Sequence, residues 1–108
     1  MMNLTRGEDF TIEIFFDLDM DALENFEVLV VQHGKTVICK EMAEAEIDRD
    51  EKCAYILLSG EETARLSSGE PAWAQTRGIL TDGEVLHSEV EEINAVDTLL
   101  ERRNRPWC

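Results

Sequence analysis

Residues 72–93 read AWAQTRGILTDGEVLHSEVEEI, and the Asp82-Gly83 pair inside this stretch predicts a β-hairpin. A two-residue type I′ turn needs positive φ at both central positions, and Asp and Gly are residue types that tolerate it. We therefore expect one strand over residues 72–80 and a second over residues 85–93. Neither strand carries recognisable chemistry, so this stretch predicts an architecture and not an activity.

The turn also sets the expected pairing of the two strands. With Asp82 and Gly83 as the loop, Ile79 faces Leu86 and Trp73 faces Glu92. One face then holds large apolar side chains and is expected to pack on the core: Trp73, Ile79, Leu86 and Val90. The other face is expected to be solvated: Ala72, Ala74, Thr76 and Gly78 with His87, Glu89 and Glu91. A β-bulge would reverse the assignment, because a slip of one residue moves every side chain to the opposite face.

Four further strands are expected upstream of the hairpin, and three of them precede residue 41. Residues 10–18 alternate with period two, which places five apolar side chains on one face of a half-buried strand: Phe10, Ile12, Ile14, Phe16 and Leu18. Residues 26–32 are apolar on both faces, which indicates a central strand. The turn at residues 33–35 leads into the β-branched run 36–40, which can pair back on the central strand.

The middle of the chain is expected to connect these strands to the hairpin. Residues 41–52 are dense in charge and predict a solvated crossover, with an edge strand or a short helix as open alternatives. Residues 53–58 then return as a buried strand. Ser59 or Gly60 can cap a helical turn over residues 61–66, whose early acidic residues suit a helix N-terminus.

This order of elements predicts one all-β domain. Several short strands joined by turns, with one short helical turn and no βαβ rhythm, are typical of a sandwich of about seven antiparallel strands. We place the sandwich at residues 1–96 and a C-terminal tail at residues 97–108, for which a short helix and a frayed terminus are both open. The locally basic end of the tail allows a further interpretation, a docking tail for an acidic neighbouring subunit.

The composition argues against several classes of partner. The chain has 108 residues with 44% hydrophobic content, enough for one core without metal or disulfide staples. With 24 acidic against 10 basic residues and a net charge of −14, its surface is expected to repel nucleic acid and anionic membranes. No apolar run reaches the roughly 18 residues of a membrane span, and the first residues lack the apolar stretch of a signal peptide. We therefore expect a cytoplasmic location on expression.

The three cysteines give no sign of a metal site or a disulfide framework. Cys39, Cys53 and Cys108 are odd in number, widely spaced and without a Cys-x-x-Cys motif. Cys39 and Cys53 lie in predicted strands and are expected to be buried thiols.

Motifs for other chemistry are equally weak. Residues 17–21, DLDMD, resemble the start of a calcium loop, but Ala22 and Val28 stand where that loop has its Gly and Glu. His33 and His87 lie near no recognisable nucleophile motif. We therefore expect no catalytic residue, no metal ligand and no cofactor.

A set of turn and packing residues carries a family resemblance over roughly residues 8–96. A Phe-rich strand from Phe10 to Phe16 precedes a corner and then the Asp-Gly hairpin. The matching residues after the first strand are Glu62, Thr63, Leu66, Gly69, Trp73, Gln75, Arg77 and the run Leu80-Thr81-Asp82-Gly83, with a closing strand through Ile93. In these features the chain resembles small prophage structural proteins, in particular the immunoglobulin-like N-terminal domain of phage baseplate upper proteins.

The resemblance implies an immunoglobulin-like β-sandwich that acts as a non-catalytic structural or interaction module of a phage or prophage particle, in the baseplate, tail or neck, and is located in the virion after assembly. Its partners would be other virion proteins or further copies of the chain, with no direct contact to nucleic acid or membrane. We select four residues as candidate partner contacts: Phe15, Trp73, Arg77 and Trp107.

Two other functions remain open from the sequence. An acidic cytosolic binding or inhibitor protein could imitate the charge of a nucleic acid, in keeping with the net charge of −14. A carbohydrate-binding module would need an exposed aromatic platform, which one Tyr and two Trp residues can scarcely supply.

Overall fold

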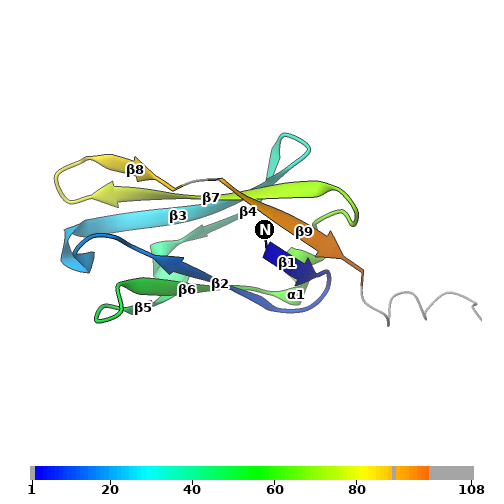
Figure 1. Cartoon of the computed structure of the whole chain (residues 1–108), viewed down its shortest axis with the longest axis horizontal. Helices are drawn as coiled ribbons and strands as arrows, with labels where there is room; N and C mark the ends of the chain where they lie inside the picture. Colours follow the sequence, from blue (N-terminus) through cyan, green and yellow to red (C-terminus); the bar gives the residue numbers. More distant parts are fainter. Residues whose placement is uncertain (1, 89, 98–108) are drawn as a thin grey trace, which may run out of the picture.

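The computed structural model describes residues 2–88 and 90–97, which form two β-sheets facing each other (Figure 1). The nine strands of these residues are β1 Met2–Thr5, β2 Phe10–Phe15, β3 Leu23–Gln32, β4 Lys35–Glu41, β5 Ala45–Asp48, β6 Cys53–Leu58, β7 Pro71–Leu80, β8 Val85–His87 and β9 Glu91–Val96. The short helical elements are η1 Met20–Ala22, η2 Met42–Glu44 and α1 Gly60–Thr63.

The order of the strands is that of an immunoglobulin-like sandwich. The larger sheet runs β1-β9-β7-β3-β4, with β8 also paired to β7, and the smaller sheet runs β2-β6-β5. In the usual lettering, β9-β7-β3-β4 corresponds to strands G-F-C-C′ and β2-β6-β5 to strands B-E-D. The predicted all-β immunoglobulin-like fold is therefore confirmed. The differences are in detail: there are nine strands among the described residues instead of about seven, and β1 pairs with β9 in parallel.

The core lies between the two sheets and is built around β3. The inward side chains Phe26, Val28 and Val30 are buried, and Ile56 and Leu58 of β6 face them from the other sheet. The predicted central strand is confirmed, since β3 pairs with both β4 and β7.

The first predicted strand is shorter than expected but keeps its inward face. β2 ends at Phe15, yet Phe16 and Leu18 beyond it still pack on the core. The ring of Phe16 lies 5.3 Å from that of Phe26, measured between centroids. The crossover before β6 contains η2 and the edge strand β5, in agreement with the expected edge strand.

The hairpin between β7 and β8 is present, but its turn is not of type I′. Gly83 has φ of +90°, as predicted, whereas Asp82 is not among the residues with positive φ. The N–H of Gly83 donates to the C=O of Leu80 at 2.9 Å, and the N–H of Leu80 donates to the C=O of Glu84 at 2.8 Å. This is the three-residue loop in which a left-handed glycine forms a bulge.

The bulge shifts the pairing by one residue near the turn. Ile79 pairs with Val85 and Gly78 with Leu86, so the predicted pair Ile79–Leu86 is wrong. The predicted second strand also divides into β8 and β9. On β9 the pairing returns to the predicted register, with Trp73 opposite Glu92.

The predicted core face of β7 is wrong as well. The small residues Ala72, Ala74 and Gly78 face inward and are buried, whereas Trp73 is 44% exposed on the outer face of the larger sheet. Leu86 and Val90 are exposed too, at 40% and 54%. The space at Gly78 is limited by a side chain of a neighbouring strand, because a Cβ on Gly78 would lie 3.3 Å from Cδ1 of Leu23. The prediction considered only the hydrophobicity of the side chains, and it could not take into account the space available to each of them in the core.

The two described cysteines differ. Cys53 is buried, as predicted, but the prediction that Cys39 is buried is wrong. Cys39 pairs with Leu29 on the outer face of the edge strand β4, while its neighbour Ile38 takes the inward position.

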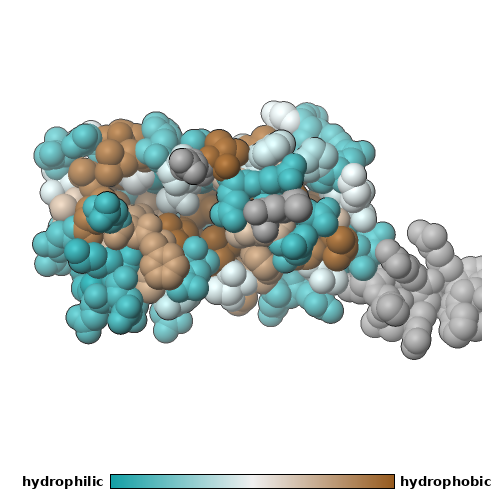
Figure 2. Space-filling view, viewed as in Figure 1, coloured by the Kyte–Doolittle hydropathy of each residue, from teal (hydrophilic) through white to brown (hydrophobic). Residues whose placement is uncertain are grey.

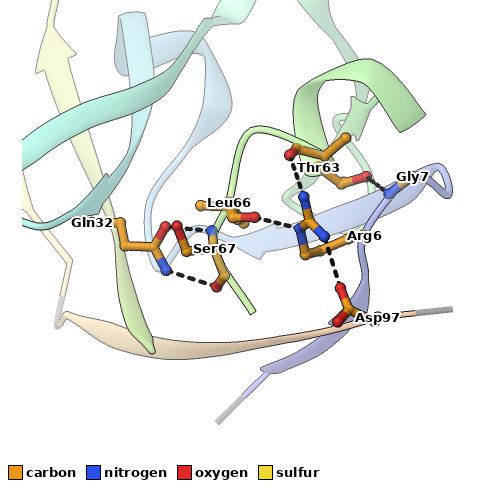
Figure 3. Close-up of polar contacts among 8 residues, drawn as sticks. Arg6, Gly7, Gln32, Thr63, Leu66, Ser67 and Asp97 are labelled. Carbon is orange, nitrogen blue, oxygen red and sulfur yellow. Dashed lines mark hydrogen bonds and ion pairs between the residues drawn. The ribbon is translucent and has the colours of Figure 1, made fainter. Parts of the chain in front are cut away.

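A polar cluster closes the sandwich at the end that carries α1 (Figure 3). Arg6 donates to the backbone C=O groups of Leu66 and Ala64 and forms an ion pair of 2.7 Å with Asp97. These contacts give hydrogen-bond partners to carbonyl groups that follow the helical turn. We call the contacts of Arg6, together with those of Gln32 and Thr63 described next, the closed end.

Two buried polar side chains complete the closed end. The Nε2 of Gln32 donates to the C=O groups of Ser67 and Glu70, each at 3.1 Å, and its Oε1 accepts from the N–H of Ser67 at 2.7 Å. Thr63 Oγ1 accepts from the N–H of Gly7 at 3.1 Å. The loop that leads into β7 and the chain before β2 are thereby fixed to the same end of the sandwich.

The predicted cap of α1 is confirmed. The side chain of Ser59 accepts from the N–H of Glu62 at 3.2 Å, and the Glu62 carboxylate accepts from the N–H of Ser59 at 3.0 Å. This reciprocal capping box satisfies two backbone donors at the start of the turn.

Candidate functional site

An apolar groove runs along one side of the sandwich, between the two sheets. Its two adjoining parts have volumes of about 300 Å³ and 340 Å³ and share Ile14, Phe15, Thr76 and Ser88 among their lining residues. We call it the seam groove. Residues 12–18 line one side, and the main lining residues of the other are Val28, Ala74, Thr76, Gly78, Leu86, His87, Ser88 and Glu91.

The groove is open because two edge strands bound it. Among the described residues, β2 is the outer strand of the smaller sheet and pairs only with β6, and the three-residue strand β8 pairs only with β7. Figure 2 shows apolar residues in a hollow between the sheets, on the half of the molecule that carries β8, with hydrophilic residues on either side. Apolar side chains that would meet a further strand are therefore open to solvent here.

The backbone of β2 also faces this opening. The N–H of Phe16 donates to the C=O of Lys52 at 2.8 Å, and Phe15 lies opposite Cys53. Hydrogen-bonded positions alternate along an antiparallel strand, so the backbone groups of Thr11, Glu13 and Phe15 point away from β6. No strand of the described residues pairs with this edge.

The rim of the groove is acidic. Glu13, Asp17 and Glu91 line it, and no Lys or Arg is among the lining residues described. An apolar floor, a negative rim and an unpaired strand edge together can bind an extended polypeptide that carries apolar and basic side chains.

The structure does not bring the predicted contact residues together. Phe15 is 70% exposed and lies at the lip of the seam groove. Trp73 and Arg77 share the outer face of the larger sheet, where Arg77 forms an ion pair with Glu27 on β3. Trp107 lies outside the described residues, as do residues 98–108 of the predicted tail.

Sequence reasoning missed the groove itself. Its far wall depends on Leu86, which the predicted register assigned to the core, and on the break between β8 and β9. Phe15 was the one available signal, because it is a large apolar side chain on the outward side of an alternating strand.

The groups with shifted pKa lie away from the groove. Burial acts to raise the pKa of Glu62, but the hydrogen bonds from Lys40 and from the backbone of Ser59 outweigh it and lower the pKa below 4.5. The Nζ of Lys40 lies 2.8 Å from Oε2 of Glu62. On the outer face of the smaller sheet, the hydrogen bond between the Cys53 and Tyr55 side chains raises the pKa of Tyr55 to about 12, with a further contribution from the Cys53 charge.

The residues of the calcium-like stretch and the two histidines have other contacts. Asp19 caps η1 by accepting from the N–H of Asp21 at 3.0 Å. His33 lies in the β3–β4 turn, with its Nε2 2.5 Å from the carboxylate of Glu70, and His87 is exposed on β8. Within residues 2–88 and 90–97, no group of three or more His, Cys, Asp or Glu side chains could hold a metal ion.

The sequence matches no protein-family model, and a search of curated proteins likewise finds no match. Among the described residues, no helix is both long enough and apolar enough to cross a membrane.

Proposed function

We propose that this chain is a non-catalytic structural and interaction module of a phage or prophage particle, in a baseplate, tail or neck assembly. The observation that carries the proposal is the seam groove, an apolar opening beside the unpaired edge of β2. Strand edges of this kind are sites where proteins add a strand from another chain. We propose a phage particle as the setting because the turn and packing residues of the chain resemble those of phage baseplate domains.

The energetics favour a partner at the groove. Full burial of an apolar side chain stabilises a complex by about 1.5–3 kcal/mol. Phe15, Leu86 and Val90 are 70%, 40% and 54% exposed, and Phe15 and Leu86 line the groove. A partner that covers Phe15 and Leu86 and also pairs with the edge of β2 gains both apolar burial and backbone hydrogen bonds.

Recovery of the chain from particles tests the proposal. Particles from the source strain would be purified by density gradient and their proteins identified by mass spectrometry. We expect the chain to sediment with the particles at a fixed ratio to their other structural proteins. Its absence from particles, with the free chain abundant in the same lysate, would contradict the proposal.

The net charge of −14 supports a second candidate, an acidic binding or inhibitor protein that imitates a nucleic acid. Such a protein binds a basic cleft through many carboxylates, so its complex dissociates steeply as salt increases. A partner bound in the apolar groove should be much less sensitive to salt. Capture of a DNA-binding enzyme that is released at moderate salt would favour this second function over the first.

A further inference from the structure

We propose that the seam groove binds residues 98–108 of a second copy of this chain, so that copies associate head to tail. The proposal names the partner of the groove and rests on the proposed assembly function. Recovery of the chain from particles tests the proposed function, whereas self-association of the purified chain tests this inference. Either of the two proposals can therefore fail without the other.

Charge is the first argument. Residues 98–108 read TLLERRNRPWC and contain three Arg and one Glu, a net charge of +2. The remainder of the chain therefore carries 7 basic and 23 acidic residues, a net charge of −16. The rim of the groove presents Glu13, Asp17 and Glu91 without a lining Lys or Arg. The net positive charge of the segment thus complements the acidic rim of the groove.

Apolar content and backbone are the second argument. The segment supplies Leu99, Leu100 and Trp107 for an apolar floor that is formed largely by Ile14, Phe16 and Leu86. Its residues 98–105 contain no proline, so every second residue of the extended segment can donate a backbone N–H to the edge of β2. Extended, the segment spans at most about 40 Å. The groove follows residues 12–18, about 20 Å of extended chain.

The position of Asp97 favours a second copy over the same chain. β9 runs from Glu91 at the groove to Val96, and Asp97 forms an ion pair with Arg6 at the closed end. Asp97 therefore lies about 20 Å along the chain from Glu91 at the groove. A return within the same chain would use about half of the segment before it reached the groove. The segment of a neighbouring copy meets no such constraint.

Pairing of β2 with β2 of a second copy is the competing arrangement. Antiparallel pairing about the centre of the exposed edge places Glu13 opposite Glu13 of the other copy. Like charges directly opposite each other across two strands are destabilising. The groove and the basic segment instead form two different, complementary surfaces, which is the geometry of a head-to-tail contact.

Two full-length variants separate the two surfaces. The first, the tail variant, combines Arg102→Glu, Arg103→Glu and Arg105→Glu and keeps an intact groove. The second, the groove variant, carries Phe15→Ser and keeps an intact tail. Leu57→Ser is the matched control, because Leu57 is 53% exposed on the neighbouring strand β6 and does not line the groove. All samples are kept reduced, since Cys39 is exposed.

Sedimentation velocity across a concentration series gives the readout. We expect the parent and Leu57→Ser to associate as concentration rises, and the tail and groove variants each to remain monomeric. A mixture of the two variants should form a 1:1 complex and stop there, because only one intact groove and one intact tail can meet. A labelled peptide of residues 98–108 should bind Phe15→Ser at least about tenfold more weakly than it binds the parent or Leu57→Ser.

A charge exchange completes the test. Glu13→Lys with Asp17→Lys in the tail variant should restore association, since the rim and the segment then have opposite charges again. A parent that stays monomeric at every concentration overturns the proposal, as does a tail variant that associates like the parent. Unchanged melting temperatures of Phe15→Ser and Leu57→Ser would show that a loss of association does not arise from unfolding.

Discussion

The closed end and the seam groove are built in opposite ways from the same sandwich. At the closed end, Arg6, Gln32 and Thr63 satisfy backbone groups of the corner and of the chain before β2. At the seam groove, no strand of the described residues pairs with the open edge of β2, and Phe15 is 70% exposed. A fold that closes one end with buried hydrogen bonds and leaves an apolar groove open along one side separates stability from binding. Variants at the closed end should therefore unfold the domain, and variants at the groove should change its association.

The largest effect is expected at Gln32. Gln32→Ala removes three hydrogen bonds from a side chain that is 2% exposed and leaves backbone groups of Ser67 and Glu70 without partners. We expect a loss of about 2–4 kcal/mol in the free energy of unfolding, measured by urea denaturation. Gln75→Ala is the control, since Gln75 is half-buried and donates one hydrogen bond, to Ser88. Equal losses for the two variants would remove the distinction between the regions.

The next effect concerns the hairpin that forms one wall of the groove. Gly83 has φ of +90°, so Gly83→Val should lower the free energy of unfolding by about 1–2 kcal/mol. Gly83→Asn should lower it less, because Asn tolerates the left-handed region. If Gly83→Val were as stable as the parent in thermal unfolding, the bulge at Gly83 would not stabilise the hairpin.

Trp73 tests the corrected face of β7. Because Trp73 is 44% exposed, Trp73→Ala should cost about 1 kcal/mol, well below the 3–5 kcal/mol typical of a buried Trp. Ala72→Leu on the buried face should cost more than Trp73→Ala, about 1–3 kcal/mol, through overpacking. Thermal and urea unfolding of the two variants compare the faces directly, and the reverse order would restore the face predicted from the sequence.

Much of the fold could be predicted because alternation and turn residues act locally. The inward face of residues 10–18, the central strand at 26–32 and the Ser59 cap all follow from side chains within a few positions of one another. The face of β7 depends on how much room Leu23 and the other neighbours leave, and the register depends on a bulge at Gly83. Neither property is present in the pattern of residues alone.

The candidate site was harder to predict for the same reason. The seam groove exists because β2 and β8 are both edges and because β8 and β9 are separate strands. Both features depend on how segments that are distant in the sequence pack together in the fold. Phe15 was identified from its outward position, but Leu86 and the acidic rim could be recognised only after the two sheets were placed face to face.

The smallest effect is the pH dependence of Glu62. Its pKa is lower in the folded chain than its ordinary value of 4.5, so its interactions stabilise the fold above that pH and are lost as pH falls through the folded pKa. Glu62→Gln should therefore cost about 1 kcal/mol at neutral pH. The difference between parent and variant should vanish in acid, as followed by urea unfolding at several pH values. A difference independent of pH would show that the carboxylate charge contributes nothing at this corner.

Hydrogen exchange along β2 tests most directly whether the seam groove is the binding surface. The backbone N–H groups of Thr11, Glu13 and Phe15 point to the open edge, whereas those of Ile12 and Ile14 point to β6. In the monomeric tail variant, the first three amides should exchange quickly and the latter two slowly. In the associated parent, all five should be protected. Protection of Ile12 and Ile14 alone, unchanged by association, would contradict the account.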